Sequence, residues 1–148
     1  MSNVLNPVEL TSALIKCRSI TPTSAGSIDL IISYLEPMGF TCTKIDFGQG
    51  DEKVENLYAR LGSLEPNICF AGHVDVVPPG DEQSWSIDPF GGEIKKGKIW
   101  GRGAADMKSG IAAFIAAISK FMEMNNNLQD YGSISLICLL YTSPSPRD

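Results

Sequence analysis

Several features that would point to particular functions are missing from this chain of 148 residues. No cluster of basic residues is longer than the pair Lys95-Lys96, and the net charge is −5, so the sequence offers no basic surface for nucleic acid. The longest apolar run, within Ile111 to Ile118, is too short to span a bilayer, and the N-terminus has no basic region followed by an apolar core. We therefore expect a cytoplasmic protein without a nucleic-acid or membrane partner.

Residues that bind metals through sulfur or imidazole are also scarce. The four cysteines form no C-x-x-C pair, which gives no sign of a thiolate zinc site or a redox motif, and we interpret them as buried free thiols: Cys17, Cys42, Cys69 and Cys138. His73 is the only histidine. Any metal must therefore be held by an imidazole and carboxylates, a ligand set that suits zinc but also admits cobalt or manganese.

Composition and patterning predict a globular α/β fold. Hydrophobic residues make up 43% and charged residues 20% of the chain, as in ordinary globular domains. We expect helices over residues 7–17, 27–38 and 107–124, strands over residues 40–47, 56–61, 67–77 and 131–137, a hairpin over residues 92–101 and a polar loop over residues 125–130. The near-continuous apolar character of residues 67–77 predicts a central strand that is buried on both faces. The expected architecture is a mixed, mostly parallel sheet flanked by helices.

Three side chains form the candidate site. His73 and Asp75 are two residues apart at the end of the central apolar run, so strand geometry places them on one face, at the carboxyl end where α/β sheets bind ligands. A carboxylate can hold one imidazole nitrogen and leave the other free for a metal. Asp106, directly before the start of the last predicted helix, is a candidate second ligand. Two alternatives stay open: His73 and Asp75 also fit a structural hydrogen-bonded pair, and Asp106 also fits a helix N-cap.

The loop between these elements has two interpretations. Residues 78–90 contain three prolines and several polar side chains, which is typical of a surface loop. Such a loop either lines the entrance for a substrate or simply connects two elements.

The residue sequences of three motifs identify a family. The segment FAGHVDVVPPG (residues 70–80), then Trp85 and Pro89-Phe90, then GRGAADMKSG (residues 101–110) resembles the co-catalytic zinc amidohydrolases and peptidases. The resemblance covers roughly residues 5 to 137. It implies a zinc-peptidase-like catalytic domain with two zinc ions, replaceable by cobalt. It also implies that His73 is a metal ligand, that Asp106 bridges the two ions and that Asp75 is a catalytic residue that orients His73.

The same resemblance narrows the expected reaction. Within the family, Pro78-Pro79 and Ala104-Ala105 before Asp106 are most similar to members of diaminopimelate and lysine biosynthesis. The expected reaction is hydrolysis of the amide of N-succinyl-LL-2,6-diaminopimelate, a small-molecule substrate, to succinate and LL-2,6-diaminopimelate. An acetylornithine deacetylase or a dipeptidase is the alternative within the family. The resemblance further implies a homodimer formed through a domain that is absent from this chain.

The end of the sequence departs from the family pattern. After Ile137 the family has two adjacent glutamates, the first of which is the general base, whereas residues 138–148 contain no acidic pair. We interpret residues 1–137 as the N-terminal portion of the catalytic domain. Residues 138–148 resemble translated sequencing-adapter sequence, and we expect a peripheral, non-native tail; the alternative is a genuine, divergent C-terminus. Because the base and the remaining ligands are missing, this chain alone is expected to be an inactive fragment.

Overall fold

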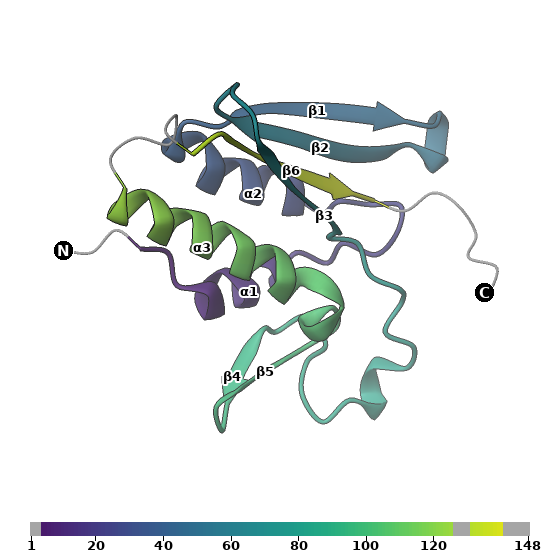
Figure 1. Ribbon diagram of the computed structural model, residues 1–148. Coiled ribbons are helices and arrows are strands. Elements are labelled where there is room, and N and C mark those ends of the chain that lie inside the picture. The colour runs from purple at the N-terminus through teal and green to yellow at the C-terminus, as the bar shows by residue number, and fades with distance from the viewer. Residues whose placement is uncertain (1–3, 126–130, 141–148) are drawn as a thin grey trace.

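The helices of this chain lie on one face of a four-stranded sheet (Figure 1). The structure is a computed structural model and describes residues 4–125 and 131–140. The helices are α1 (Pro7–Lys16), α2 (Ser27–Leu35) and α3 (Ser109–Met124). The sheet contains β1 (Thr41–Phe47), β2 (Val54–Leu61), β3 (Asn67–His73) and β6 (Ser133–Leu139). A separate hairpin is formed by β4 (Glu93–Lys95) and β5 (Lys98–Trp100).

Local signals set the helix ends as expected. The side chain of Asn6 accepts a hydrogen bond from the backbone N–H of Val8 at 2.9 Å, so Asn6 is the N-cap of α1. Helix α2 continues into a short 3-10 turn that ends before Gly39, whose φ of 89° is the usual glycine stop. Only α3 begins later than predicted, because Asp106 and Met107 have non-helical backbone angles.

The sheet is mixed, as predicted, but it is not mostly parallel. Its strand order is β1-β2-β6-β3. The pairs β1/β2 and β2/β6 are antiparallel, and only β3/β6 is parallel. The physical reason is the short connection between β1 and β2, residues 48–53, because a short link joins antiparallel neighbours whereas parallel strands need a long crossover.

Strand β3 is an edge strand of the described sheet, which corrects the prediction of a central strand buried on both faces. Its inner face packs on α3, where the rings of Phe70 and Phe114 stack with centroids 4.7 Å apart. The side chains of its opposite face, Cys69 and Ala71, are exposed, and Ile68, beside Phe70 on the inner face, is 65% exposed. The central position belongs to β6, which lies between β2 and β3. An apolar run therefore reported burial on one face only.

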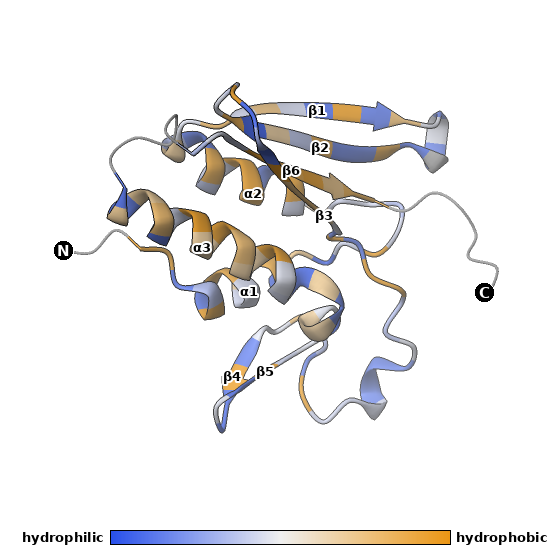
Figure 2. Cartoon of the chain, viewed as in Figure 1, coloured by the Kyte–Doolittle hydropathy of each residue, from blue (hydrophilic) through white to orange (hydrophobic). Residues whose placement is uncertain are grey.

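The core lies between the helices and the sheet, and Figure 2 shows apolar residues along α2, α3 and β6. It includes residues beyond the predicted end of the domain. Cys138 and Leu140 are buried, and the backbone N–H of Leu140 donates to Asn56 Oδ1 at 2.8 Å. The expectation that everything after residue 137 is peripheral is therefore wrong for Cys138 and Leu140, because strand β6 continues to Leu139 and carries these two side chains into the core. Residues 141–148, and the loop predicted around residues 126–130, lie outside the described residues.

The four cysteines differ in their exposure. Cys138 is buried, and this burial raises the pKa of its thiol to about 12. Cys69 is exposed on β3, so the prediction of buried thiols is wrong for this residue. Cys17 and Cys42 are half-buried. All four are free thiols.

The hairpin was predicted correctly. Its two turn residues, Lys96 and Gly97, have φ of 51° and 71°, the left-handed values that a two-residue hairpin turn requires. The hairpin extends away from the sheet (Figure 1). In the part of the chain that the structure describes, no helix has the length and apolar character needed to cross a membrane.

The packing of α3 gives a stability prediction. Ile115 is fully buried on α3, so Ile115→Ala should lower the free energy of unfolding by about 2–5 kcal/mol through lost burial and a cavity. Ile94 in the hairpin is 53% exposed, and Ile94→Ala should change it by less than about 1 kcal/mol. Urea unfolding followed by circular dichroism measures both. Equal effects of the two substitutions would contradict the assigned core.

Candidate metal centre

The candidate site lies where the parallel pair β3/β6 ends. His73 is the last residue of β3, and Asp75 follows it in an extended segment. Asp106 belongs to a π-helical turn, Ala104–Lys108, that leads into α3. The structure thus brings together all three residues predicted from sequence, at the carboxyl end of a parallel strand, where ligand sites of α/β sheets form.

The imidazole of His73 contacts both acidic residues. Nδ1 lies 3.0 Å from the backbone oxygen of Asp75, and Nε2 lies 3.1 Å from Asp106 Oδ1. The carbonyl can only accept, so Nδ1 carries a proton and donates it. In the neutral ring this fixes the tautomer with a lone pair on Nε2, the nitrogen that faces Asp106.

Asp75 is the buried member of the group, with 4% exposure. Its Oδ2 accepts a hydrogen bond of 2.6 Å from the hydroxyl of Thr21, and its Oδ1 lies 3.5 Å from Nδ1 of His73. Nδ1 of His73 therefore lies near both the backbone oxygen and the carboxylate of Asp75, and the backbone contact is the shorter of the two.

Asp106 is not the N-cap of α3. The cap position is occupied by Lys108, and Asp106 itself has φ −127° and ψ 100°. Its carboxylate is 86% exposed and is directed at His73. This geometry removes the N-cap alternative and leaves the carboxylate accessible to a ligand.

The two atoms that face each other fit a shared metal ion. Zinc bonds to nitrogen and to oxygen are about 2.0–2.2 Å long, so two ligand atoms of one ion must lie within about 4.2 Å of each other. Nε2 of His73 and Oδ1 of Asp106 are 3.1 Å apart, which meets this limit. Among residues 4–125 and 131–140, no group of three or more metal-binding side chains is found. His73 and Asp106 therefore form a facing pair rather than a larger cluster of metal-binding side chains in these residues.

The charge of the site is set by its two acids. The pKa of His73 is raised from 6.5 to about 9, first by the Asp75 side chain and further by Asp106, against the opposing effect of burial. The metal-free imidazole is therefore protonated at neutral pH. A metal ion that binds Nε2 must displace a proton.

Sequence reasoning missed two residues that support the site. Thr21 lies between α1 and α2, outside the motifs, and its hydroxyl donates to the carboxylate of Asp75. Lys108 is fully buried, and Nζ donates to the backbone oxygens of Leu14 at 2.8 Å and Cys17 at 2.9 Å. Burial lowers the pKa of Lys108 to about 8. Lysine is normally an exposed residue, so the sequence gives no reason to expect a buried one at this position. The only available signal for Lys108 is its place two residues after Asp106.

The proline-containing loop, residues 78–90, packs on its surroundings. The indole N–H of Trp85 donates to Pro79 O at 3.0 Å, and the guanidinium of Arg102 lies 5.1 Å from the centre of the Trp85 ring. Arg18 stacks over Phe90 and forms an ion pair with Glu82. The loop is thereby attached to the segment that precedes the Asp106 turn.

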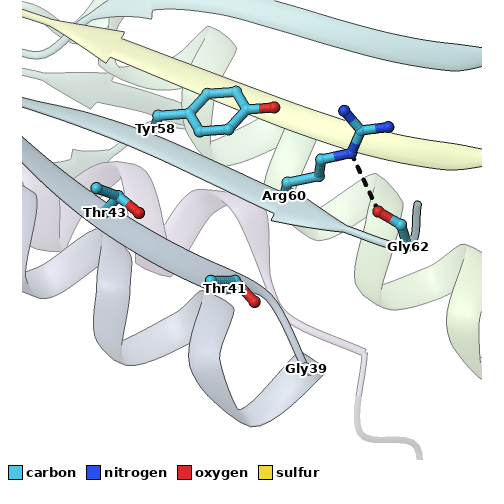
Figure 3. A pocket seen from close by; sticks show the side chains of 6 residues that line it. All are labelled: Gly39, Thr41, Thr43, Tyr58, Arg60 and Gly62. Atoms are coloured by element: carbon cyan, nitrogen blue, oxygen red, sulfur yellow. Dashed lines mark hydrogen bonds between the residues drawn. The ribbon is translucent and has the colours of Figure 1, made fainter.

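A hollow lies on β1 and β2, away from the candidate metal centre (Figure 3). It is lined by Gly39, Thr41, Thr43, Tyr58, Arg60 and Gly62. None of these is an acid or a histidine, and two nitrogens of Arg60 already donate, to Gly62 O and to Ser133 Oγ. Arg60 pairs with Ser135, four residues along β6 from the partner of His73, roughly 13 Å away. The hollow is therefore separate from the candidate metal centre.

Comparisons with known proteins indicate the family of this chain. Residues 69–138 match the family described as peptidase family M20/M25/M40. The succinyl-diaminopimelate desuccinylase of Rhodospirillum centenum is 56% identical over 133 residues, which cover 89% of this chain and 34% of that protein. The protein of the same name from Caulobacter vibrioides is 50% identical over 134 residues, 90% of this chain and 32% of that protein. This chain is a homologue of the M20/M25/M40 peptidases.

Solved structures confirm the α/β fold. Human carnosine dipeptidase 1 superposes with a TM-score of 0.74 and 26% identity over 90% of this chain and 31% of that one. The M20 family metallo-carboxypeptidase Sso-CP2 of Sulfolobus solfataricus has a TM-score of 0.77 at 20% identity over 92% of this chain and 31% of that one, a likeness of fold. The chain spans about a third of the length of the curated relatives it matches. His73, Asp75 and Asp106 all lie within the matched family segment.

The site predicts an unusual histidine titration. In the metal-free chain, the imidazole of His73 should titrate near pH 9 rather than 6.5, and its NMR signals are identified directly because it is the only histidine. Since the folded pKa exceeds the unfolded one, the stability that His73 contributes is complete below about pH 6.5 and is lost as the pH rises through about 9.

Removing the acid that raises the pKa most is the direct check. Asp75→Asn should move the midpoint back toward 6.5, whereas Glu93→Gln, in the exposed hairpin, should leave it unchanged. A titration midpoint of His73 at or below pH 6.5 in the unsubstituted chain would show that the acids do not contact the ring in solution.

Proposed function

We propose that the protein to which this chain belongs hydrolyses the amide of N-succinyl-LL-2,6-diaminopimelate to succinate and LL-2,6-diaminopimelate, using two zinc ions. The observation that carries the proposal is the contact between His73 Nε2 and Asp106 Oδ1 at 3.1 Å, in a segment homologous to the peptidases. The substrate follows from relatives about 50% identical that are named succinyl-diaminopimelate desuccinylases.

The side chains have separate roles in this proposal. His73 would hold one ion through Nε2, and the exposed carboxylate of Asp106 would be the ligand shared by the two ions. When bound, the zinc pair polarises the amide carbonyl and makes a water acidic enough to attack near neutral pH. Cobalt can replace zinc at imidazole and carboxylate ligands.

Asp75 serves the reaction through His73. Its backbone oxygen holds Nδ1–H, and its buried carboxylate sits beside the ring at 3.5 Å. A negative charge behind the imidazole makes Nε2 a stronger donor to a metal. Thr21 in turn holds Asp75 Oδ2, so the orientation of the ring depends on a chain of two contacts.

The residues of this chain form only part of the proposed site. Zinc is held tightly by three or four protein ligands, and His73 and Asp106 supply two. We propose that residues 1–137 are the N-terminal portion of the catalytic domain and that further chain supplies the general base and other ligands. The exposed apolar Ile68 on β3 supports additional covering chain. The proposal further includes that the full protein is a homodimer. This chain alone, with two ligands and no general base, binds zinc weakly and releases no succinate.

A dipeptidase is the second candidate. Human carnosine dipeptidase 1 shares the fold and 26% of the aligned residues, but the desuccinylases share about twice that fraction. The identity difference places the desuccinylase first.

A substrate profile of the full-length protein tests the proposal. Loaded with zinc, it should hydrolyse N-succinyl-LL-2,6-diaminopimelate with a kcat/KM at least 100-fold above that for N-acetylornithine or a dipeptide, in line with recognition by paired polar groups (on the order of 10² or more). Removal of zinc with a chelator should abolish the rate. A higher kcat/KM on the dipeptide would replace the proposed substrate.

The two acids should separate metal binding from turnover. In the full-length protein, Asp106→Ala removes the proposed bridge and should lower the zinc content from two ions to one or none per chain, measured by plasma emission. Asp75→Ala should keep most of the metal but reduce kcat by about 10–100-fold, the usual cost of losing a group behind a ligand.

Glu93→Ala in the hairpin is the control and should change neither quantity. Two zinc ions retained by Asp106→Ala would refute the bridging role.

A further inference from the structure

One short segment contacts both parts of the candidate site, namely the chain that follows His73 and, through Lys108, the turn that bears Asp106. Residues 17–21 leave the end of α1 and run beside residues 74–76, which follow His73. Ser19 Oγ donates to Val74 O at 2.6 Å, and Val76 N–H donates to Ser19 O at 2.8 Å. Ile20 and Val76 form a parallel bridge. The segment is thus fixed to the backbone on which Asp75 lies.

The far end of the segment reaches the carboxylate itself. Thr21 Oγ1 donates to Asp75 Oδ2 at 2.6 Å, and Thr21 N–H donates to Val76 O at 3.3 Å. A short hydrogen bond to a buried carboxylate is a charge-assisted one and is among the stronger kinds. It fixes the carboxylate relative to the segment.

The near end of the segment is attached to the Asp106 turn by Lys108. The lysine side chain runs back from the start of α3 to the end of α1, where Nζ donates to Leu14 O and Cys17 O at 2.8 and 2.9 Å. The last carbonyls of a helix have no partners within the helix and carry its negative dipole end, so an ammonium suits them. Lys108 therefore joins two elements that are 91 residues apart.

The path of the lysine stem is closely packed. A Cβ added to Gly103 would lie 2.6 Å from Val76 Cγ1 and 3.2 Å from Lys108 Cδ. Only a glycine leaves room for the stem between the turn and the residue after Asp75. Burying an ammonium group costs free energy, and the hydrogen bonds that it donates offset this cost. An apolar side chain would fill the same space without the cost. The feature that an apolar residue lacks is the link to α1.

We propose that Lys108 and Thr21 are positioning residues, which act through the segment of residues 17–21 to hold Asp106 within metal-bridging distance of His73. Lys108 fixes the turn that bears Asp106, and Thr21 fixes the carboxylate behind the His73 ring. The inference rests on the proposed function only in calling this distance a metal-bridging one. The contact it explains, 3.1 Å between His73 and Asp106, exists without metal.

The test uses the imidazole NMR signals of the only histidine, recorded on the metal-free chain of 148 residues at one fixed pH. Asp106→Ala supplies the spectrum of a lost contact. Lys108→Met keeps the length of the side chain and removes its donors, and Thr21→Val keeps the shape and removes the hydroxyl. Both variants should shift the imidazole signals, Lys108→Met by at least half the distance to the Asp106→Ala position.

Two controls separate positioning from general stability. Ile115→Ala weakens the core elsewhere on α3 and should leave the imidazole signals unchanged, and so should Lys120→Met, which removes an exposed lysine from the same helix. Thermal unfolding by circular dichroism identifies any variant that is not folded. Thr21→Val is conclusive by itself should Lys108→Met not fold.

A second measurement extends the test to metal. In the full-length protein, Lys108→Met and Thr21→Val should each weaken zinc binding by about 10–100-fold, with Lys120→Met unchanged. Parent-like imidazole signals in folded Lys108→Met and Thr21→Val would overturn the positioning role. Failure of the substrate profile would overturn the proposed function alone, because the imidazole signals require neither substrate nor zinc.

Discussion

The close approach of α3 to the end of β3 is the constraint on which the site depends. Gly72, the residue before His73, has no side chain at the point of contact. A Cβ there would lie 3.0 Å from Met107 Cε and 3.2 Å from Ile111 Cγ1, closer than such atoms normally pack. Because the strand offers only backbone at this point, the start of the helix can lie against it. The Asp106 turn then falls beside the imidazole, and the stacked rings of Phe70 and Phe114 maintain the approach further along.

The electrostatics of the site follow from this approach. Two carboxylates, one buried and one exposed, face a single imidazole, and without metal the ring balances them by holding a proton. A divalent cation supplies the same compensation with more charge. The buried acid, Asp75, is the one that cannot be left uncompensated, since a buried carboxylate is costly unless it is paired and hydrogen-bonded. A metal ion at Nε2 would replace the contact with Asp106, which is the smaller of the two effects on the pKa of His73, and would leave the Asp75 contact in place.

The described residues form a well-packed helical side and a sparsely covered sheet side. All three α-helices of the described chain lie on one side of the sheet (Figure 1), and β3 exposes Cys69 and Ala71 on the opposite face. An apolar edge strand is a surface on which other chain commonly packs or pairs. This arrangement is consistent with relatives that are about three times as long as the matched segment.

The sequence by itself determined most of the local structure and was enough to select the candidate site residues. Caps, glycine stops and the Lys96-Gly97 turn set element ends because they act on neighbouring backbone, and His73, Asp75 and Asp106 were identified from spacing and from the wording of the motifs. Only the tertiary structure decided which strands are neighbours, that β6 and not β3 is central, and that the strand continues past residue 137. Hydrophobic pattern reports that a face is covered but not by which partner, since pairing is a contact between distant residues. Thr21 and Lys108 were missed for the same reason: their hydrogen bonds reach acceptors 54 and 91 residues away, beyond any local pattern.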